Sequence, residues 1–190
     1  MKIVMVAFIC LLFSGCASTE VTNRWRDPQY NGRFISAVVV CLTADSAVAR
    51  ECRDIFVRQL SRRGVRAVPG TGTMSTSSQD ARAGARERGL EMVLVSRFMD
   101  KRSELEFYYR EGSMLFMPHS DIWSEGVNTR ENEFELFTTV LYDVASGKAV
   151  WSASSSTYVA GSQEKVLTSF VEAMLDEMER QGLIDGGHGR

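Results

Sequence analysis

The residues of this chain that could carry covalent chemistry are its four cysteines, because a thiolate can be acylated, can pair in a disulfide or can bind a metal ion. They are Cys10, Cys16, Cys41 and Cys52. No CxxC pair occurs, and the two histidines, His119 and His188, lie far apart in the sequence. The spacing therefore predicts no metal site and leaves acylation and disulfide formation as the reactions to consider.

Cys16 ends a segment with the three parts of an export signal. Lys2 gives a short positive region, residues 3–13 are all apolar, and Ser14 and Gly15 come directly before the cysteine. A helix needs roughly 20 apolar residues to cross a hydrocarbon core, so this run is too short for a permanent anchor. The pattern predicts a signal peptide over residues 1–15.

The same segment resembles the lipobox of bacterial lipoproteins, with Phe13 where those proteins usually have leucine. The resemblance implies that Cys16 is acylated, and two or three acyl chains would anchor it stably because one chain binds a membrane only marginally. The alternative is a plain secretory signal cleaved nearby. Ala17 and Ser18 follow the cysteine. By the sorting rule of Gram-negative lipoproteins, these residues imply the periplasmic face of the outer membrane.

Cys41 and Cys52 are the cysteines of the folded part. Cys41 falls near the end of a predicted strand, and Cys52 falls on the apolar side of the next predicted helix. An oxidising periplasm would permit them to pair. Two buried free thiols are the alternative, which the sequence favours by a small margin, so the pairing stays open.

Known catalytic motifs are missing from the sequence. It contains no GxSxG, HExxH or GxxxxGK[ST], and the Gly70-Thr71-Gly72 run lacks the third glycine of a dinucleotide loop. His119 is followed by Ser120 and Asp121, but catalytic triads are assembled from distant segments rather than from neighbours on one loop. The sequence therefore predicts a protein without enzymatic activity and without a cofactor.

Length and charge restrict the kind of partner. Removing residues 1–15 leaves 190 − 15 = 175 residues, a length that fits one domain. The chain has 22 Lys and Arg residues against 24 Asp and Glu residues, which gives a net charge of −2. Because nucleic-acid binding needs clustered cations, this balance argues against a nucleic-acid partner.

Hydrophobic periodicity predicts one α/β domain over residues 34–184. Strands are expected over residues 34–42, 65–68, 92–98, 134–144 and 149–159, and helices over residues 45–63, 77–89 and 162–181. The alternation of the first elements predicts a parallel βαβαβ core, and the turn at Gly147 predicts an antiparallel hairpin that extends it into a mixed sheet with three helices. Residues 16–33 are expected to form a lipidated tether, and residues 185–190 a disordered tail.

Residues 100–130 form an aromatic insertion in this domain. Its candidate binding residues are Phe107, Tyr108, Tyr109, Leu115, Phe116, Met117 and Trp123. A long irregular loop is often functional, and aromatic and Met side chains are enriched in interface cores. The alternative shape is a hairpin in which Leu105–Tyr109 pairs with Met114–Met117, and its exposed edge could also recruit a partner.

Several short motifs together resemble a known group of proteins. They are Trp25-Arg26-Asp27-Pro28, the Val-rich strand over residues 34–42, Leu141-Tyr142-Asp143, Gly147-Lys148 and Trp151. With the cysteine at position 16, they resemble proteobacterial outer-membrane lipoproteins without assigned activity, whose soluble module is similar to the amino-terminal domain of TolB and to LpoB. The resemblance covers most of residues 25–183 and implies a small α/β adaptor fold that performs no reaction.

These observations predict a lipid-anchored accessory or adaptor protein that binds another envelope protein. A glycan- or lipid-binding module is the alternative, and it needs a cleft lined by aromatic side chains with a few convergent polar groups. A hydrolase is the third possibility, and it needs a nucleophile within hydrogen-bond reach of a histidine or a carboxylate pair. The sequence leaves the oligomeric state open.

Overall fold

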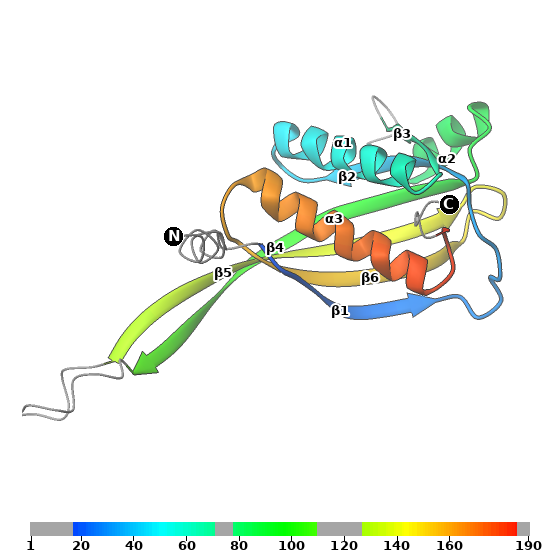
Figure 1. The fold of residues 1–190 in the computed structure, drawn as a ribbon. Coiled ribbons are helices and arrows are strands. Elements are labelled where there is room, and N and C mark those ends of the chain that lie inside the picture. Colours follow the sequence, from blue (N-terminus) through cyan, green and yellow to red (C-terminus); the bar gives the residue numbers. More distant parts are fainter. Residues whose placement is uncertain (1–16, 71–77, 110–126, 186–190) are drawn as a thin grey trace, which may run out of the picture.

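A computed structural model describes residues 17–70, 78–109 and 127–185, with only the backbone described for residues 78, 106–109 and 127–130 (Figure 1). The elements are β1 (Thr19–Arg26), β2 (Ser36–Leu42), α1 (Ser46–Arg62), β3 (Arg66–Pro69), α2 (Ser78–Glu87), β4 (Met92–Tyr109), β5 (Val127–Asp143), β6 (Ala149–Tyr158) and α3 (Gln163–Arg180). The described strands form one six-stranded sheet in the order β1-β6-β5-β4-β2-β3.

The predicted parallel core is confirmed. β2 lies between β3 and β4 and runs parallel to both, while α1 and α2 make the two crossover connections. Residues 36–41 of β2 are all buried, as expected of a nearly continuous apolar strand covered on both faces. The α/β class with three helices among the described residues is therefore as predicted.

The antiparallel half of the sheet is also confirmed. β5 pairs with β4 on one side and with β6 on the other. The β5–β6 connection turns at Gly147, whose φ of 72° lies in the left-handed region that glycine adopts readily. β1 then pairs with the far side of β6.

Helices cover the two faces of the sheet unequally. α1 and α3 pack side by side on one face, where the larger buried cluster includes Phe56, Phe137, Trp151 and Phe170 (Figure 1). On the other face, α2 packs against β2 and β4, and the smaller cluster includes Val38, Ala85 and Val93. On the face that carries α2, the strands β1, β6 and β5 therefore have no helix over them among the described residues.

The amino-terminal segment differs from the expected tether. Thr19–Arg26 forms β1, whose outer edge is free of other described strands. The polar residues that suggested a tether instead contact the last helix. Arg24 donates to the buried Glu177 of α3 at 3.2 Å. Arg26 also donates to the backbone carbonyl of Gln181, just beyond α3. These contacts fix the amino terminus of the domain to its last helix.

The insertion over residues 100–130 also differs from expectation. β4 continues without interruption to Tyr109, and Leu105–Tyr109 pairs with Glu131–Val127 of β5. The described partner of Leu105–Tyr109 is thus β5, and the predicted partner, Met114–Met117, lies outside the described residues. The sequence suggested a long irregular loop because this segment has no continuous apolar pattern, but a two-stranded ribbon can expose both of its faces and accept charged residues on each.

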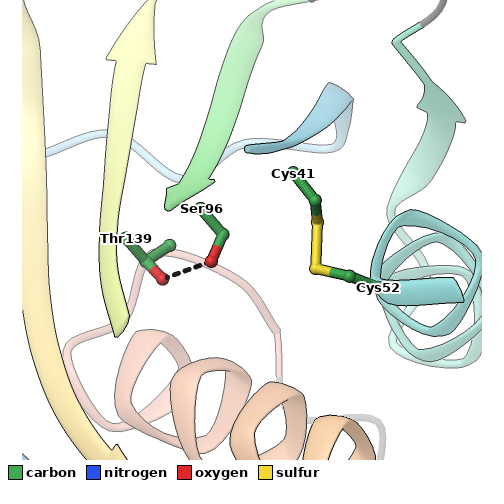
Figure 2. The surroundings of a disulfide bond; sticks show 4 residues. All are labelled: Cys41, Cys52, Ser96 and Thr139. Carbon is green, nitrogen blue, oxygen red and sulfur yellow. Dashed lines mark hydrogen bonds between the residues drawn. A yellow bond between two sulfur atoms is a disulfide. The ribbon is translucent and has the colours of Figure 1, made fainter. Parts of the chain in front are cut away.

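A disulfide joins β2 to α1. The Sγ atoms of Cys41 and Cys52 are 2.12 Å apart and their Cα atoms are 6.2 Å apart (Figure 2). Both residues are 4% exposed. The sequence left this pairing open and slightly favoured free thiols, because the approach of the helix to the strand cannot be obtained from periodicity alone.

No helix of the described residues is long and apolar enough to cross a membrane.

Replacing Glu177 with Ala is expected to lower the free energy of unfolding by about 2–3 kcal/mol, because Arg24, Arg180 and Gln181 lose a buried acceptor. Urea denaturation of the chain without residues 1–15 measures the loss. Lys165→Ala, at an exposed position of the same helix, is the control, and its effect should stay within about 0.5 kcal/mol. Equal effects of the two changes would show that the buried contacts of Glu177 do not stabilise the domain.

The double change Cys41→Ser and Cys52→Ser is expected to cost about 2–3 kcal/mol, because the cross-link closes a short loop in the unfolded chain. Thermal unfolding of oxidised and dithiothreitol-treated protein should show the same loss for the native chain and none for the variant. The expectation would be contradicted if dithiothreitol left the unfolding temperature of the native chain unchanged although mass spectrometry showed that the disulfide was reduced.

Candidate functional site

The predicted site residues lie largely outside the described side chains. Phe107, Tyr108 and Tyr109 end β4, where their backbones pair with Thr129, Asn128 and Val127. Leu115, Phe116, Met117 and Trp123 lie outside the described residues, as do Cys16 and His119. Ala17 and Ser18 are the first described residues. The structure therefore places the start of the candidate surface at the end of β4 and leaves the grouping of the seven residues as a prediction.

β4 and β5 extend past the rest of the sheet as a two-stranded ribbon (Figure 1). β2 pairs with β4 only as far as Arg97, and β6 pairs with β5 only from Phe134 onward. Past these strands, the pairing of β4 with β5 continues alone from Ser103 to Tyr109, a length of about 24 Å at the usual rise of a strand. Met99 and Leu105, at 56% and 62% exposure, are large apolar residues on β4.

A pocket of about 260 Å³ lies at the root of this ribbon. It is enclosed by the end of β2, the first turns of α1 and α3, and the middle of β4 and β5. Its lining residues are Cys41, Leu42, Thr43, Asp45, Val48, Cys52, Ser96, Phe98, Lys101, Glu135, Phe137, Gln163 and Leu167. Most of these side chains are apolar, and the disulfide forms part of the wall.

Glu135 is the central polar group of the pocket. Its side chain is 5% exposed, and its Oε1 lies 3.5 Å from Nζ of Lys101, whose side chain is 59% exposed. Gln163, in the first turn of α3, donates from Nε2 to Oε2 of Glu135 at 3.3 Å. Both contacts are long, and both partners come from elements other than β5. A buried carboxylate is thus held loosely at the boundary between apolar walls and solvent.

A second polar pair lies deeper beside the disulfide. Thr139 of β5 donates its hydroxyl to Ser96 of β4 at 3.3 Å, and Ser96 is the strand partner of Cys41 (Figure 2). All three residues are buried. This hydrogen bond satisfies two hydroxyl groups that would otherwise be costly to bury.

The uncovered face of the sheet is a second surface. Trp25, Ser152, Val140 and Val95 follow one another across β1, β6, β5 and β4 as strand partners. Trp25 is 47% exposed, and the other three are half-buried. Near the ribbon on the same face, the Arg102 guanidinium lies 5.6 Å from the centre of the Phe134 ring. This face is partly apolar.

The pocket has features of a small binding site. It combines apolar and aromatic walls with a few convergent polar groups, as small binding sites do. Among the described residues, no three His, Cys, Asp or Glu side chains are grouped to hold a metal ion. The pocket can accept a ligand that has an apolar stem and a polar head, with the stem against the apolar walls and the head paired with Glu135 or Lys101.

Sequence reasoning missed Glu135, Lys101 and Gln163 as site residues. One signal was present, because Glu135 shares its side of an alternating strand with Phe137 and Leu141. That side faces α1 and α3, so the glutamate had to be buried or paired. The approach of Lys101 depends on the bulge between Phe98 and Asp100, which periodicity does not reveal.

No protein-family model and no curated protein matches this chain. Among solved structures, it is similar to the PelC dodecamer of Paraburkholderia phytofirmans, with 19% identity, a TM-score of 0.51, and coverage of 84% of this chain and 94% of that one. A single-substitution variant of that dodecamer gives 20% identity and the same TM-score, with 84% and 95% coverage. Lipoprotein GNA1162 of Neisseria meningitidis is less similar, with 15% identity, a TM-score of 0.44, and 76% and 98% coverage. At these identities, the likeness to PelC establishes a shared fold.

Proposed function

We propose that this chain is a lipid-anchored lipoprotein of the bacterial outer membrane that faces the periplasm. In this proposal, it performs no reaction and acts as an accessory or adaptor that binds another envelope protein. The lipobox-like segment before Cys16 supports the anchor, and the disulfide supports export because such bonds persist in oxidising compartments.

One observation carries the binding role, namely the ribbon formed by β4 and β5. A two-stranded ribbon is at best marginally stable in water, and this one extends past the sheet with both outer edges free among the described residues. A protein partner that covers the ribbon would stabilise it. The charged side chains of Lys101, Arg102 and Glu104 are exposed there, which disfavours insertion of this part of the ribbon into hydrocarbon.

The first described residues and the root of the ribbon lie at the same end of the domain. Tyr158 donates its backbone N–H to the carbonyl of Ser18 at 2.8 Å, and Val159 donates to the carbonyl of Glu133 at 2.8 Å. Ser18 is therefore next to the strands that begin the ribbon. Two residues, Ala17 and Ser18, separate Cys16 from Thr19. The three steps between them extend at most about 3.6 Å each, so the acyl chains would hold this end within about 11 Å of the lipid headgroups.

A glycan- or lipid-binding module is the second candidate. The pocket favours it, because Phe98 and Phe137 line an apolar space beside Glu135 and Lys101. These aromatic residues are not the Tyr108, Tyr109 and Trp123 that the sequence suggested for such a cleft.

Replacing Cys16 with Ala is expected to abolish labelling by a clickable fatty acid and to move the protein from the membrane to the soluble fraction. The physical reason is the loss of every acyl chain that partitions into the bilayer. Cys10→Ala, in the signal peptide, is the matched control and should leave labelling unchanged. Labelling that survives the Cys16 change would remove the anchor from the proposal.

Photocrosslinking from position 105 is expected to capture one dominant envelope protein, because Leu105 is an exposed apolar residue on the ribbon. The same probe at position 58, on the exposed side of α1, is the control. Mass spectrometry identifies the captured proteins in intact cells. Identical capture patterns from the two positions would contradict a partner bound at the ribbon.

A further inference from the structure

We propose that the free edge of β4 beside the pocket is a strand-addition site. Its ligand is an extended segment of a partner protein that places one lysine or arginine side chain in the pocket, against Glu135. This inference rests on the proposed adaptor function and names the chemistry of the partner at the same site.

The backbone edge is the first part of the argument. β2 accompanies β4 only to the pair of Leu42 and Arg97, after which the chain turns toward α1. From Phe98 to Tyr109, β4 has β5 on one side, and none of the described strands pairs with its other side. Unpaired N–H and C=O groups along a strand are a template for another strand, and several peptide-binding domains use such an edge.

The position of the pocket is the second part. Leu42 ends β2, Phe98 and Lys101 begin the free edge of β4, and all three residues line the pocket. A strand that continues the line of β2 along β4 therefore passes beside the pocket. In an added strand, alternate side chains point to the same face, so one of them can enter the pocket while the next points away.

The charges of the pocket select the side chain. Two carboxylates and the single ammonium of Lys101 line the pocket. The carboxylate of Asp45 is engaged as the N-cap of α1, where it accepts from the backbone N–H groups of Ala47 and Val48, so Glu135 is the carboxylate open to a ligand. Lys101 is mostly exposed and 3.5 Å from Glu135, a geometry that contributes little and is readily replaced. An incoming cation would find a buried carboxylate, whereas an incoming carboxylate would meet like charge.

The walls of the pocket select the shape of that side chain. Phe98, Phe137 and Leu167 surround the approach to Glu135 with apolar surface. Lysine and arginine have a long apolar stem that can lie along such a surface and a charged head that can reach a carboxylate. A neutral apolar side chain would fill the space but leave Glu135 with its two long contacts only.

The test uses the full mature chain in detergent micelles and four fluorescent octapeptides of alternating valine and threonine. Three carry a central lysine, glutamate or alanine, and the fourth is the lysine peptide with N-methyl groups on alternate residues. Fluorescence anisotropy is expected to show the lysine peptide binding at least about tenfold more tightly than the glutamate and alanine peptides. N-methylation should weaken it by a similar factor, because it removes the donors that pair with β4.

Variants of the protein separate the pocket from the backbone edge. Glu135→Gln should reduce the preference for lysine over alanine to less than about twofold, whereas Glu20→Gln, on the exposed β1, should leave it unchanged. Lys101→Met should strengthen binding of the lysine peptide by removing its competitor, which tests the pocket if Glu135→Gln fails to fold. Circular dichroism verifies the fold of each variant.

Several outcomes would overturn the inference. They are equal affinities for the three central residues, absence of binding, and equal binding of the N-methylated peptide. Displacement of the lysine peptide by phosphatidylethanolamine vesicles would instead assign the pocket to a lipid ammonium group. Crosslinking from position 105 stays a separate test, because a partner captured there without peptide selectivity would retain the adaptor function and reject strand addition.

Discussion

The attachment of β1 to α3 is the interaction on which this account depends. Arg24 reaches the buried carboxylate of Glu177, and Arg26 reaches the backbone beyond α3, so the first described strand is part of the folded body. If residues 16–33 were a free tether, the domain could present any face to its surroundings. Because β1 begins at Thr19, only a short linker joins the acylated cysteine of our proposal to the folded domain. In this proposal, the domain has little freedom to reorient, and one of its ends stays near the bilayer.

The end that is fixed in this way is also the end with unusual structure. The parallel strand β2 stops there, α1 and α3 begin there, and β4 and β5 leave the sheet together (Figure 1). Each of these features opens backbone or side-chain positions that a regular sheet would cover. The pocket and the free strand edge follow from one event, the termination of β2 beside a strand that continues.

Much of the fold could be predicted from the sequence, because apolar periodicity and glycine turns determine its elements. The run from Phe34 to Leu42 predicted the central strand, and Gly147 predicted the turn between β5 and β6. The length of β4 could not be predicted in this way, since residues 101–105 are exposed on both faces and show no apolar alternation. The place of β1 was missed for a related reason, because its charged residues are held by partners more than a hundred residues away.

The candidate site was harder to predict than the fold. The aromatic residues of the insertion were visible as a composition, whereas the pocket assembles Leu42, Lys101, Glu135 and Gln163 from separate elements. Only the buried side of β5, where a glutamate stands among apolar residues, gave a local indication. Distances between strand ends and helix starts decide such a site, and these are properties of packing rather than of sequence pattern.

The central claim is that the domain faces the membrane with its ribbon end. The test reconstitutes the acylated chain in vesicles that contain nitroxide lipids, which quench a nearby fluorophore. The fluorophore is placed either at position 99, at the root of the ribbon, or at position 35, which is exposed at the opposite end of β2. The account predicts strong quenching at position 99 and little at position 35. Equal quenching at the two positions, or stronger quenching at position 35, would contradict it.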